Sequence, residues 1–406
     1  MPWERQIRIC RASVRGTNSK NVSEPDANHE PRPKRSWPRR LLNRAEVNQA
    51  VFFALLLRGW QLAGGLVSVL LITYFFTREV QGYYYTFSSL LALQTFFELG
   101  MHLVIISAAS HEWSQLSLNE RGEIVGDTAA LSRLVSLGRS IALWYAVIAV
   151  AFVAIVGVVG VTFFALKPSA AVAWLAPWIV LVLLSGSLLW TLPLNALLEG
   201  CNQVNSVNRF RFVQTVCANL VVWTAIASGA GLWAAVAATA ARLVCELFFL
   251  GWRYRRFFQV FRQVPSGPQV QWWSDIWPMQ WRIAISGAFS YFQFFLYTPV
   301  MFYYHGAAVA GQMGMTWTLI TALEAAALAW VQTRAPLFGI LIARRDYVEL
   351  DRVFFRLTWI SLSALTLAGL AAWGLVCGLY WAHDTFSWWG FRLAERLLPP
   401  LPTAAF

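Results

Sequence analysis

The stretch SIALWYAVIAVAFVAIVGVVGVTFFAL, residues 140–166, contains no charged side chain. It exceeds the length of about 20 residues that a helix needs to cross the hydrocarbon core of a membrane. An open strand in lipid would leave backbone groups unpaired, so such a stretch predicts a helix. Similar apolar runs recur along the chain, at 47–76, 83–109, 140–166, 172–198, 208–228, 231–252, 282–304, 307–332 and 357–382. A shorter tenth run begins near Leu393. The predicted fold class is therefore all-α, a polytopic transmembrane helix bundle of nine or ten helices.

The composition agrees with a membrane protein. Of the 406 residues 58% are apolar and only 13% are charged, whereas soluble domains carry about 25% charged residues. The 22 tryptophans suit the two headgroup levels, where aromatic rings collect. The net charge of +12 is spread over many short loops, so we expect no nucleic-acid partner. The five cysteines show no metal or redox spacing and no catalytic motif is present. We therefore expect no metal, no cofactor and no enzyme activity.

The chain divides into four predicted segments. Residues 1–46 carry eleven Lys or Arg and five Asp or Glu with little apolar periodicity, which predicts a disordered basic tail. Residues 47–253 form a lobe of six helices, and 254–281 form a cytoplasmic linker. Residues 282–406 form a partial second lobe of three to four helices.

The distribution of positive charge supports this map. With the tail in the cytoplasm, the remaining cytoplasmic segments hold fifteen Lys or Arg and the outer segments hold four, namely Arg78, Lys167, Arg392 and Arg396. A missed helix would invert this bias downstream of it, so the positive-inside rule supports both the count and the orientation. We expect a multi-pass protein of the bacterial inner membrane with a cytoplasmic N-terminus.

Two helix pairs resemble each other. Each pair turns outside on a short segment, 79–82 in the first and 308–311 in the second, and an amphipathic inner segment follows, 131–134 or 350–353. Six helices separate the copies, so both have the same orientation. This pattern is typical of transporters whose halves are related by an axis along the membrane normal, and it predicts two pseudo-symmetric lobes.

Ionisable residues inside the apolar runs are candidate site residues, because a charge in lipid is costly unless it is paired or hydrated. Arg58 and Glu98 lie on the first two helices, and Arg282 and Glu324 lie on the seventh and eighth. We interpret them as a repeated Arg/Glu pair that lines a substrate cavity, with guanidinium groups for a diphosphate and carboxyl groups for protons. The alternatives are two structural ion pairs, and an interfacial anchor for Arg282.

Two further charges inside a run have a simpler interpretation. Arg242 and Glu246 are four residues apart on the sixth helix, where oppositely charged side chains are neighbours. We predict a structural ion pair between them. His102 is interpreted as a polar residue near the inner interface.

Residues 79–101, EVQGYYYTFSSLLALQTFFELGM, continue to Ser110-His111-Glu112-Trp113, and Ala196-Leu197-Leu198-Glu199-Gly200 ends the fourth helix. A short outer turn with a glycine and an aromatic residue, then Glu-Leu-Gly before the inner end of the second helix, resembles bacterial polysaccharide-biosynthesis membrane proteins. These are lipid-linked oligosaccharide flippases of the multidrug/oligosaccharidyl-lipid/polysaccharide superfamily. The resemblance extends over residues 47–385.

The resemblance implies two six-helix lobes around a central cavity. It also implies an undecaprenyl-diphosphate-linked glycan as the substrate, contact with membrane lipid, and glycan polymerase or export proteins as partners. The family has twelve or fourteen helices, so this chain departs from it in the second lobe. Two alternatives stay open: a cation-coupled drug or small-molecule antiporter of the same superfamily, and a non-transporting scaffold or truncated remnant.

A short second lobe would leave helix faces uncovered. Small residues mark helix–helix contacts, and they gather at 325–327 and at Gly369, Ala371, Ala372 and Gly374. We expect the chain to associate with a second copy through this region or to be poorly stable. The alternative is that these residues pack against the first six helices.

Overall fold

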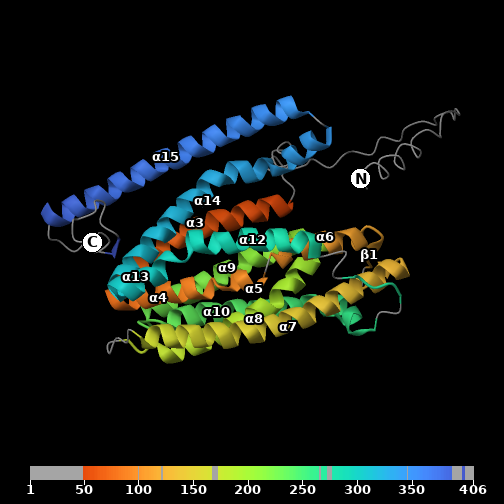
Figure 1. The fold of residues 1–406 in the computed structure, drawn as a ribbon, viewed down its shortest axis with the longest axis horizontal. Coiled ribbons are helices and arrows are strands. Elements are labelled where there is room, and N and C mark those ends of the chain that lie inside the picture. Colours follow the sequence, from red (N-terminus) through yellow and green to blue (C-terminus); the bar gives the residue numbers. More distant parts are fainter. Residues whose placement is uncertain are drawn as a thin grey trace, which may run out of the picture. The chain divides into compact units, whose positions relative to one another are not determined.

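The computed structural model describes residues 49–98, 100–119, 122–166, 172–264, 267–271, 277–344, 346–385 and 396–397. Long helices make up almost all of this part (Figure 1). One antiparallel hairpin interrupts them, formed by β1 (Leu116–Leu118) and β2 (Ile124–Gly126). The all-α fold class is thus confirmed. The predicted basic tail, residues 1–46, lies outside the described residues.

Helices occupy the first six predicted runs. They are α3 (Gln49–Phe75), α4 (Arg78–Leu91), α5 (Gln94–Glu98), α6 (Met101–Trp113), α7 (Thr128–Ala165), α8 (Leu175–Gly200), α9 (Val204–Ala227) and α10 (Trp233–Phe248). A π-helical turn, η1 (Phe249–Arg253), extends α10. Helices that are not consecutive in the chain also pack together: α7 lies against α8, α8 against α6 and α10, α10 against α9, and α9 against α3.

The predicted second run, 83–109, is divided into three helices. Gly100 adopts a left-handed conformation with φ of +67° between α5 and α6, which glycine alone adopts without cost. A Cβ atom added there would lie 2.1 Å from Cγ2 of Ile283. The break therefore lets the second half of the chain approach the first at this level of the bundle.

The remaining helices follow η1. They are α11 (Arg255–Gln259), the 3-10 turn η2 (Val260–Arg262), α12 (Trp277–Phe294), α13 (Tyr297–His305), α14 (Ala307–Arg344) and α15 (Tyr347–Thr385). Helix α15 lies alongside α14 (Figure 1). Of the tenth predicted helix, the structure describes Arg396 and Leu397.

Polar caps begin several helices where the sequence leaves an apolar run. Thr77 Oγ1 accepts a hydrogen bond of 3.2 Å from the backbone N–H of Val80 at the start of α4. Asp127 accepts one of 2.8 Å from Ala130 N at the start of α7. Such side chains satisfy N–H groups that the first helical turn leaves without a partner.

Six helices of the described part are long and apolar enough to cross a membrane, and the bent pair of α4–α5 with α6 would make a seventh. The six lie at Leu56–Phe75, Thr128–Ala165, Leu175–Gly200, Val204–Ala227, Trp233–Arg253 and Tyr347–Gly378. Helices also occupy the predicted seventh and eighth runs, but α12 and α13 are separated by Phe295 and Leu296, and α14 carries many polar residues. The membrane character of the fold is confirmed, and the count of nine crossings stays a prediction for α12 to α14.

An aromatic core joins the helices α4, α7 and α8 of the first six runs to α13 of the second half of the chain. The ring of Phe164 on α7 lies 5.2 to 5.6 Å from those of Phe87 on α4, Trp178 on α8 and Phe302 on α13. Tyr83 lies 5.0 Å from Phe302. Edge-to-face pairs of this kind contribute about 0.5–1.5 kcal/mol each beyond the area that they bury. Helix α13 is thereby fixed against the first six helical runs.

Candidate functional site

Helices α4 and α14 cross each other in close contact at Gly82 and Gly311. A Cβ atom at Gly82 would lie 1.8 Å from the backbone oxygen of Ala307, and one at Gly311 would lie 2.9 Å from the backbone nitrogen of Gly82. Gln81 Nε2 donates a hydrogen bond of 2.9 Å to the Gly311 carbonyl. Only residues without a side chain permit this approach, so the sequence positions of Gly82 and Gly311 determine where the helices meet.

The two glycines are also the residues that the sequence pairs as corresponding turns of the repeat. Each is the fifth residue of its helix. Corresponding residues of two halves touch each other only close to the axis that relates them. The crossing therefore lies where the axis of the predicted repeat would pass, and it sets a register between α4 and α14.

A cavity of about 320 Å³ follows the crossing along both helices. Three residue pairs that are separated by the same number of positions as Gly82 and Gly311 line it: Tyr85 with Gly314, Ser88 with Trp317, and Ser89 with Thr318. The remaining lining comes from Thr321 and Glu324 on α14 and from Phe294, Phe295 and Thr298 around the α12–α13 break. The cavity thus lies between the two parts of the chain, where a transporter would hold its substrate.

The chemistry of this cavity is that of neutral polar groups and one carboxyl group. The hydroxyls of Ser88, Thr318 and Thr321 donate to backbone carbonyls of their own helices. The oxygen lone pairs of Ser88 and Thr321 stay available as acceptors, while Thr318 is also hydrogen-bonded to the Tyr85 side chain. The indole Nε1–H of Trp317 is buried without a hydrogen-bond partner in the described structure. A buried donor without a partner costs about 1–3 kcal/mol, and a ligand with an acceptor oxygen would remove that cost.

Of the four predicted cavity residues, the structure places Glu324 in the cavity and the other three elsewhere. Arg58 is exposed on α3, which packs against α9. Glu98 accepts a hydrogen bond from Gln94 within α5. Arg282 is exposed, and its guanidinium carbon lies 5.6 Å from the ring centroid of Trp281, as an interfacial anchor would.

The repeated Arg/Glu pair is therefore not formed among the described residues. The glycine register aligns Glu324 with Thr95 and not with Glu98. A similar sequence spacing between charges does not fix the rotation of the helices that carry them. A direct glycine contact does fix it.

The predicted ion pair between Arg242 and Glu246 is also replaced by other contacts. The carboxylate of Glu246 is buried and accepts hydrogen bonds from Asn195 Nδ2 on α8 and, at 2.7 Å, from Gln214 Nε2 on α9. Gln214 also donates to the Arg242 carbonyl at 3.0 Å, while the Arg242 side chain is exposed. The inward direction of Glu246 brings it within reach of two amides on neighbouring helices.

One helical turn along α8, a second carboxylate is paired across helices. Arg211 on α9 approaches Glu199 at 2.5 Å, and His102 Nε2 on α6 lies 3.9 Å from the other oxygen of Glu199. The Glu199 side chain is only 11% exposed. Asn195 and Glu199 lie on one face of α8, four positions apart, which was the available sequence signal for this network. His102, which the sequence left as an interfacial polar residue, belongs to it.

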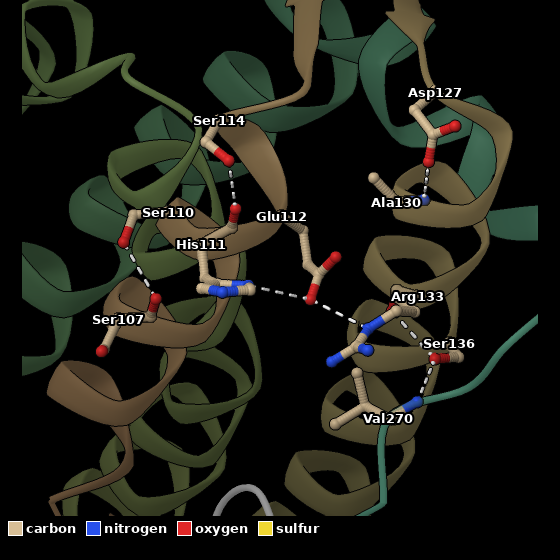
Figure 2. Close-up of polar contacts among 10 residues, drawn as sticks. All are labelled: Ser107, Ser110, His111, Glu112, Ser114, Asp127, Ala130, Arg133, Ser136 and Val270. Atoms are coloured by element: carbon tan, nitrogen blue, oxygen red, sulfur yellow. Dashed lines mark hydrogen bonds and ion pairs between the residues drawn. The ribbon is translucent and has the colours of Figure 1, made fainter. Parts of the chain in front are cut away.

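A third group of polar contacts joins α7 both to α6 and to the predicted linker. Figure 2 shows Glu112 of α6 between His111 and Arg133, at 3.4 Å and 2.9 Å. On the same helix face, Ser136 Oγ accepts a hydrogen bond of 3.1 Å from Val270 N. Ser132 Oγ accepts one of 2.9 Å from Gly267 N. The predicted linker, 254–281, is thus bound to α7 of the first lobe through Gly267 and Val270.

Neither a bound metal nor a known relative is indicated for this chain by the described residues and the comparisons. Among the described residues, no group of three or more His, Cys, Asp or Glu side chains is arranged to hold a metal ion. No model of a known protein family, no curated protein and no solved structure matches this chain. The function is therefore inferred from the cavity and the helices around it.

Proposed function

We propose that this chain is a membrane transporter that moves a lipid-linked oligosaccharide across the bacterial inner membrane, as a flippase for surface polysaccharide biosynthesis. The six apolar helices of the described residues fit a membrane transporter. The observation that carries the proposal is the cavity at the α4–α14 crossing, with its hydroxyl oxygens, its buried Trp317 N–H and its Glu324 carboxyl group.

A sugar matches this set of groups. Each glycan hydroxyl can donate to Glu324 or to a serine or threonine oxygen, and can accept from the Trp317 indole. The Tyr85 and Trp317 rings offer apolar surface to the C–H faces of a sugar ring. A cationic drug would use the carboxyl group but would leave the indole N–H without an acceptor.

The crossing also supplies a pivot. Because Gly82 and Gly311 place two backbones in direct contact without side chains between them, α14 and its neighbours can shift against α4 at this point. A shift of this kind would open the cavity to one side of the membrane and then to the other, as alternating access requires.

A cation-coupled antiporter is the second candidate, and the network on α8 favours it. Glu246 is a buried carboxylate held by two amides, and Glu199 is a largely covered one held by Arg211. Such groups are candidate sites for a coupling proton or cation. An antiporter would depend on these carboxylates for transport, whereas a flippase whose specificity lies in the cavity would depend first on Trp317 and Glu324.

The test uses a bacterial strain that produces the surface polysaccharide, lacks this protein and is complemented with variants of it. Trp317→Phe and Glu324→Gln should reduce surface glycan, measured by lectin binding, and should cause lipid-linked glycan to accumulate in the inner membrane. The matched controls are Trp359→Phe and Glu349→Gln on α15, both outside the cavity. Unchanged lipid-linked glycan in the strain without the protein would reject the flippase. Loss of activity only in Glu199→Gln and Glu246→Gln would favour the antiporter.

A further inference from the structure

A recess of about 540 Å³ lies where α10 ends, away from the cavity described above. Its wall is the segment from Trp252 to Phe257, which contains Arg253, Arg255 and Arg256. Gln203, from the α8–α9 turn, and Asn119, beside the β1–β2 hairpin, line the opposite side. The described lining contains three guanidinium groups and no carboxylate.

The backbone of this basic segment is held firmly. Helix α10 widens into the π-helical turn η1, and the chain turns at Tyr254 before α11 begins. The Phe249 ring stacks on Phe210 with centroids 4.0 Å apart, and Phe257 is buried against Trp113. With these aromatic side chains turned inward, the arginines between them are exposed and line the recess from a fixed main chain.

The amide of Gln203 is oriented by the same segment. The Tyr254 hydroxyl donates a hydrogen bond of 3.2 Å to Gln203 Oε1. An amide whose oxygen is used in this way presents its Nε2 group as a donor. The recess therefore combines guanidinium donors with a positioned amide donor, which is the donor set that phosphate oxygens accept.

The position of the recess suits a ligand at the membrane boundary. Arg253 is the last residue of the candidate span Trp233–Arg253. The Trp252 side chain beside it is 73% exposed, and tryptophan at the end of a span is typical of the headgroup level. By the charge bias of the sequence this boundary faces the cytoplasm.

We propose that this recess is a binding site for a phosphate group, contributed either by a lipid headgroup or by a soluble phosphate. Arg253 and Arg255 donate charge-assisted hydrogen bonds to the phosphate oxygens, and the Gln203 amide donates a neutral one. The proposal stands apart from the transported substrate and does not need the cavity at the α4–α14 crossing. It differs from general positive-inside anchoring, because anchoring would depend on the number of arginines and not on their place in the recess.

The test is native mass spectrometry of the full chain purified with added phosphatidylglycerol. The double variant Arg253→Gln/Arg255→Gln should lose the retained lipid, with an apparent affinity about a hundredfold lower, since each charge-assisted contact accounts for about tenfold. Arg262→Gln removes an exposed arginine of the nearby η2 turn, outside the recess, and should change the affinity by less than about twofold. Because all three arginines are exposed, the variants should fold, and sizing chromatography checks this.

Two arms separate the sources of the phosphate. Pyrophosphate that displaces the lipid from the wild-type chain would show that the phosphate group alone is the ligand. Failure of pyrophosphate to compete, with lipid still lost from the double variant, would assign the site to an intact lipid headgroup. Equal retention by the double variant and the wild type, or equal loss from Arg262→Gln, would overturn the proposal.

Discussion

Helices α8 and α15 have nearly the same mean hydropathy but very different surroundings. In the most apolar part of α8 44% of the residues are buried, against 6% in α15. Lipid and neighbouring helices both accept apolar side chains, so hydropathy locates a span without identifying what covers it. The difference lies in the small and polar residues: a Cβ at Gly186 of α8 would lie 2.4 Å from Val153, whereas Gly369 and Gly374 of α15 have nothing within 4 Å.

The open glycines of α15 bear on the predicted second lobe. They do not pack against the first six helical runs, which removes that alternative for Gly369 and Gly374. Association of two copies through this face stays a prediction. The sharper lesson is that contact in this fold is set by glycine and by buried polar groups, and the following substitutions separate those two effects.

The largest effect is expected at the helix crossing. Gly82→Leu would force a side chain into the Ala307 carbonyl, and overpacking against a backbone costs about 3 kcal/mol or more. The variant should show a strongly lowered melting temperature or fail to accumulate. The same change at Gly369, on the open face of α15, should leave the melting temperature of the solubilised protein unchanged. Equal melting behaviour of the two variants would remove the crossing as the point that organises the fold.

A smaller effect is expected from the network between α8, α9 and α10. Glu246→Leu would leave the Asn195 amide without its acceptor and would take one acceptor from Gln214, at a cost of about 1–3 kcal/mol for a buried donor. Arg242→Ala should cost less than about 0.5 kcal/mol, since surface substitutions usually do. Thermal unfolding of both variants measures the difference. Similar losses of stability in the two variants would support the ion pair between Arg242 and Glu246 that the sequence predicts.

The smallest effect is expected where the linker meets α7. Ser136→Ala removes the acceptor for Val270 N, a contact of about 1 kcal/mol. Local opening should become about fivefold more frequent, and limited proteolysis within the linker should accelerate accordingly. Ser140→Ala, on an exposed position of the same helix, is the control. An unchanged cleavage rate in Ser136→Ala would mean that other contacts hold the linker.

The sequence predicts the helices well and the site poorly, for physical reasons. Run length alone locates helices such as α7 and α8, because the bilayer sets their minimum length. The charge network on α8 depends on which faces of α8 and α9 meet, and no periodicity in either helix states this. Glu324 lines the cavity, and the sequence singles it out because a carboxyl group in an apolar run is costly. The same rule singles out Arg58, which is exposed on α3, because the rule gives the cost of a charge and not the direction of its side chain.

The central claim is that the cavity at the α4–α14 crossing admits water and substrate. The most direct test is the reactivity of Ser88→Cys with a membrane-impermeant thiol reagent, in a chain whose other cysteines are replaced except Cys201. Burial raises the pKa of the Cys201 thiol to about 12, so it stays unreactive. A hydrated thiol ionises to the reactive thiolate, so Ser88→Cys should be labelled and labelling should stop glycan display. Leu367→Cys, which is exposed on the apolar α15, should not react. A Ser88→Cys variant as inert as Leu367→Cys would contradict the claim.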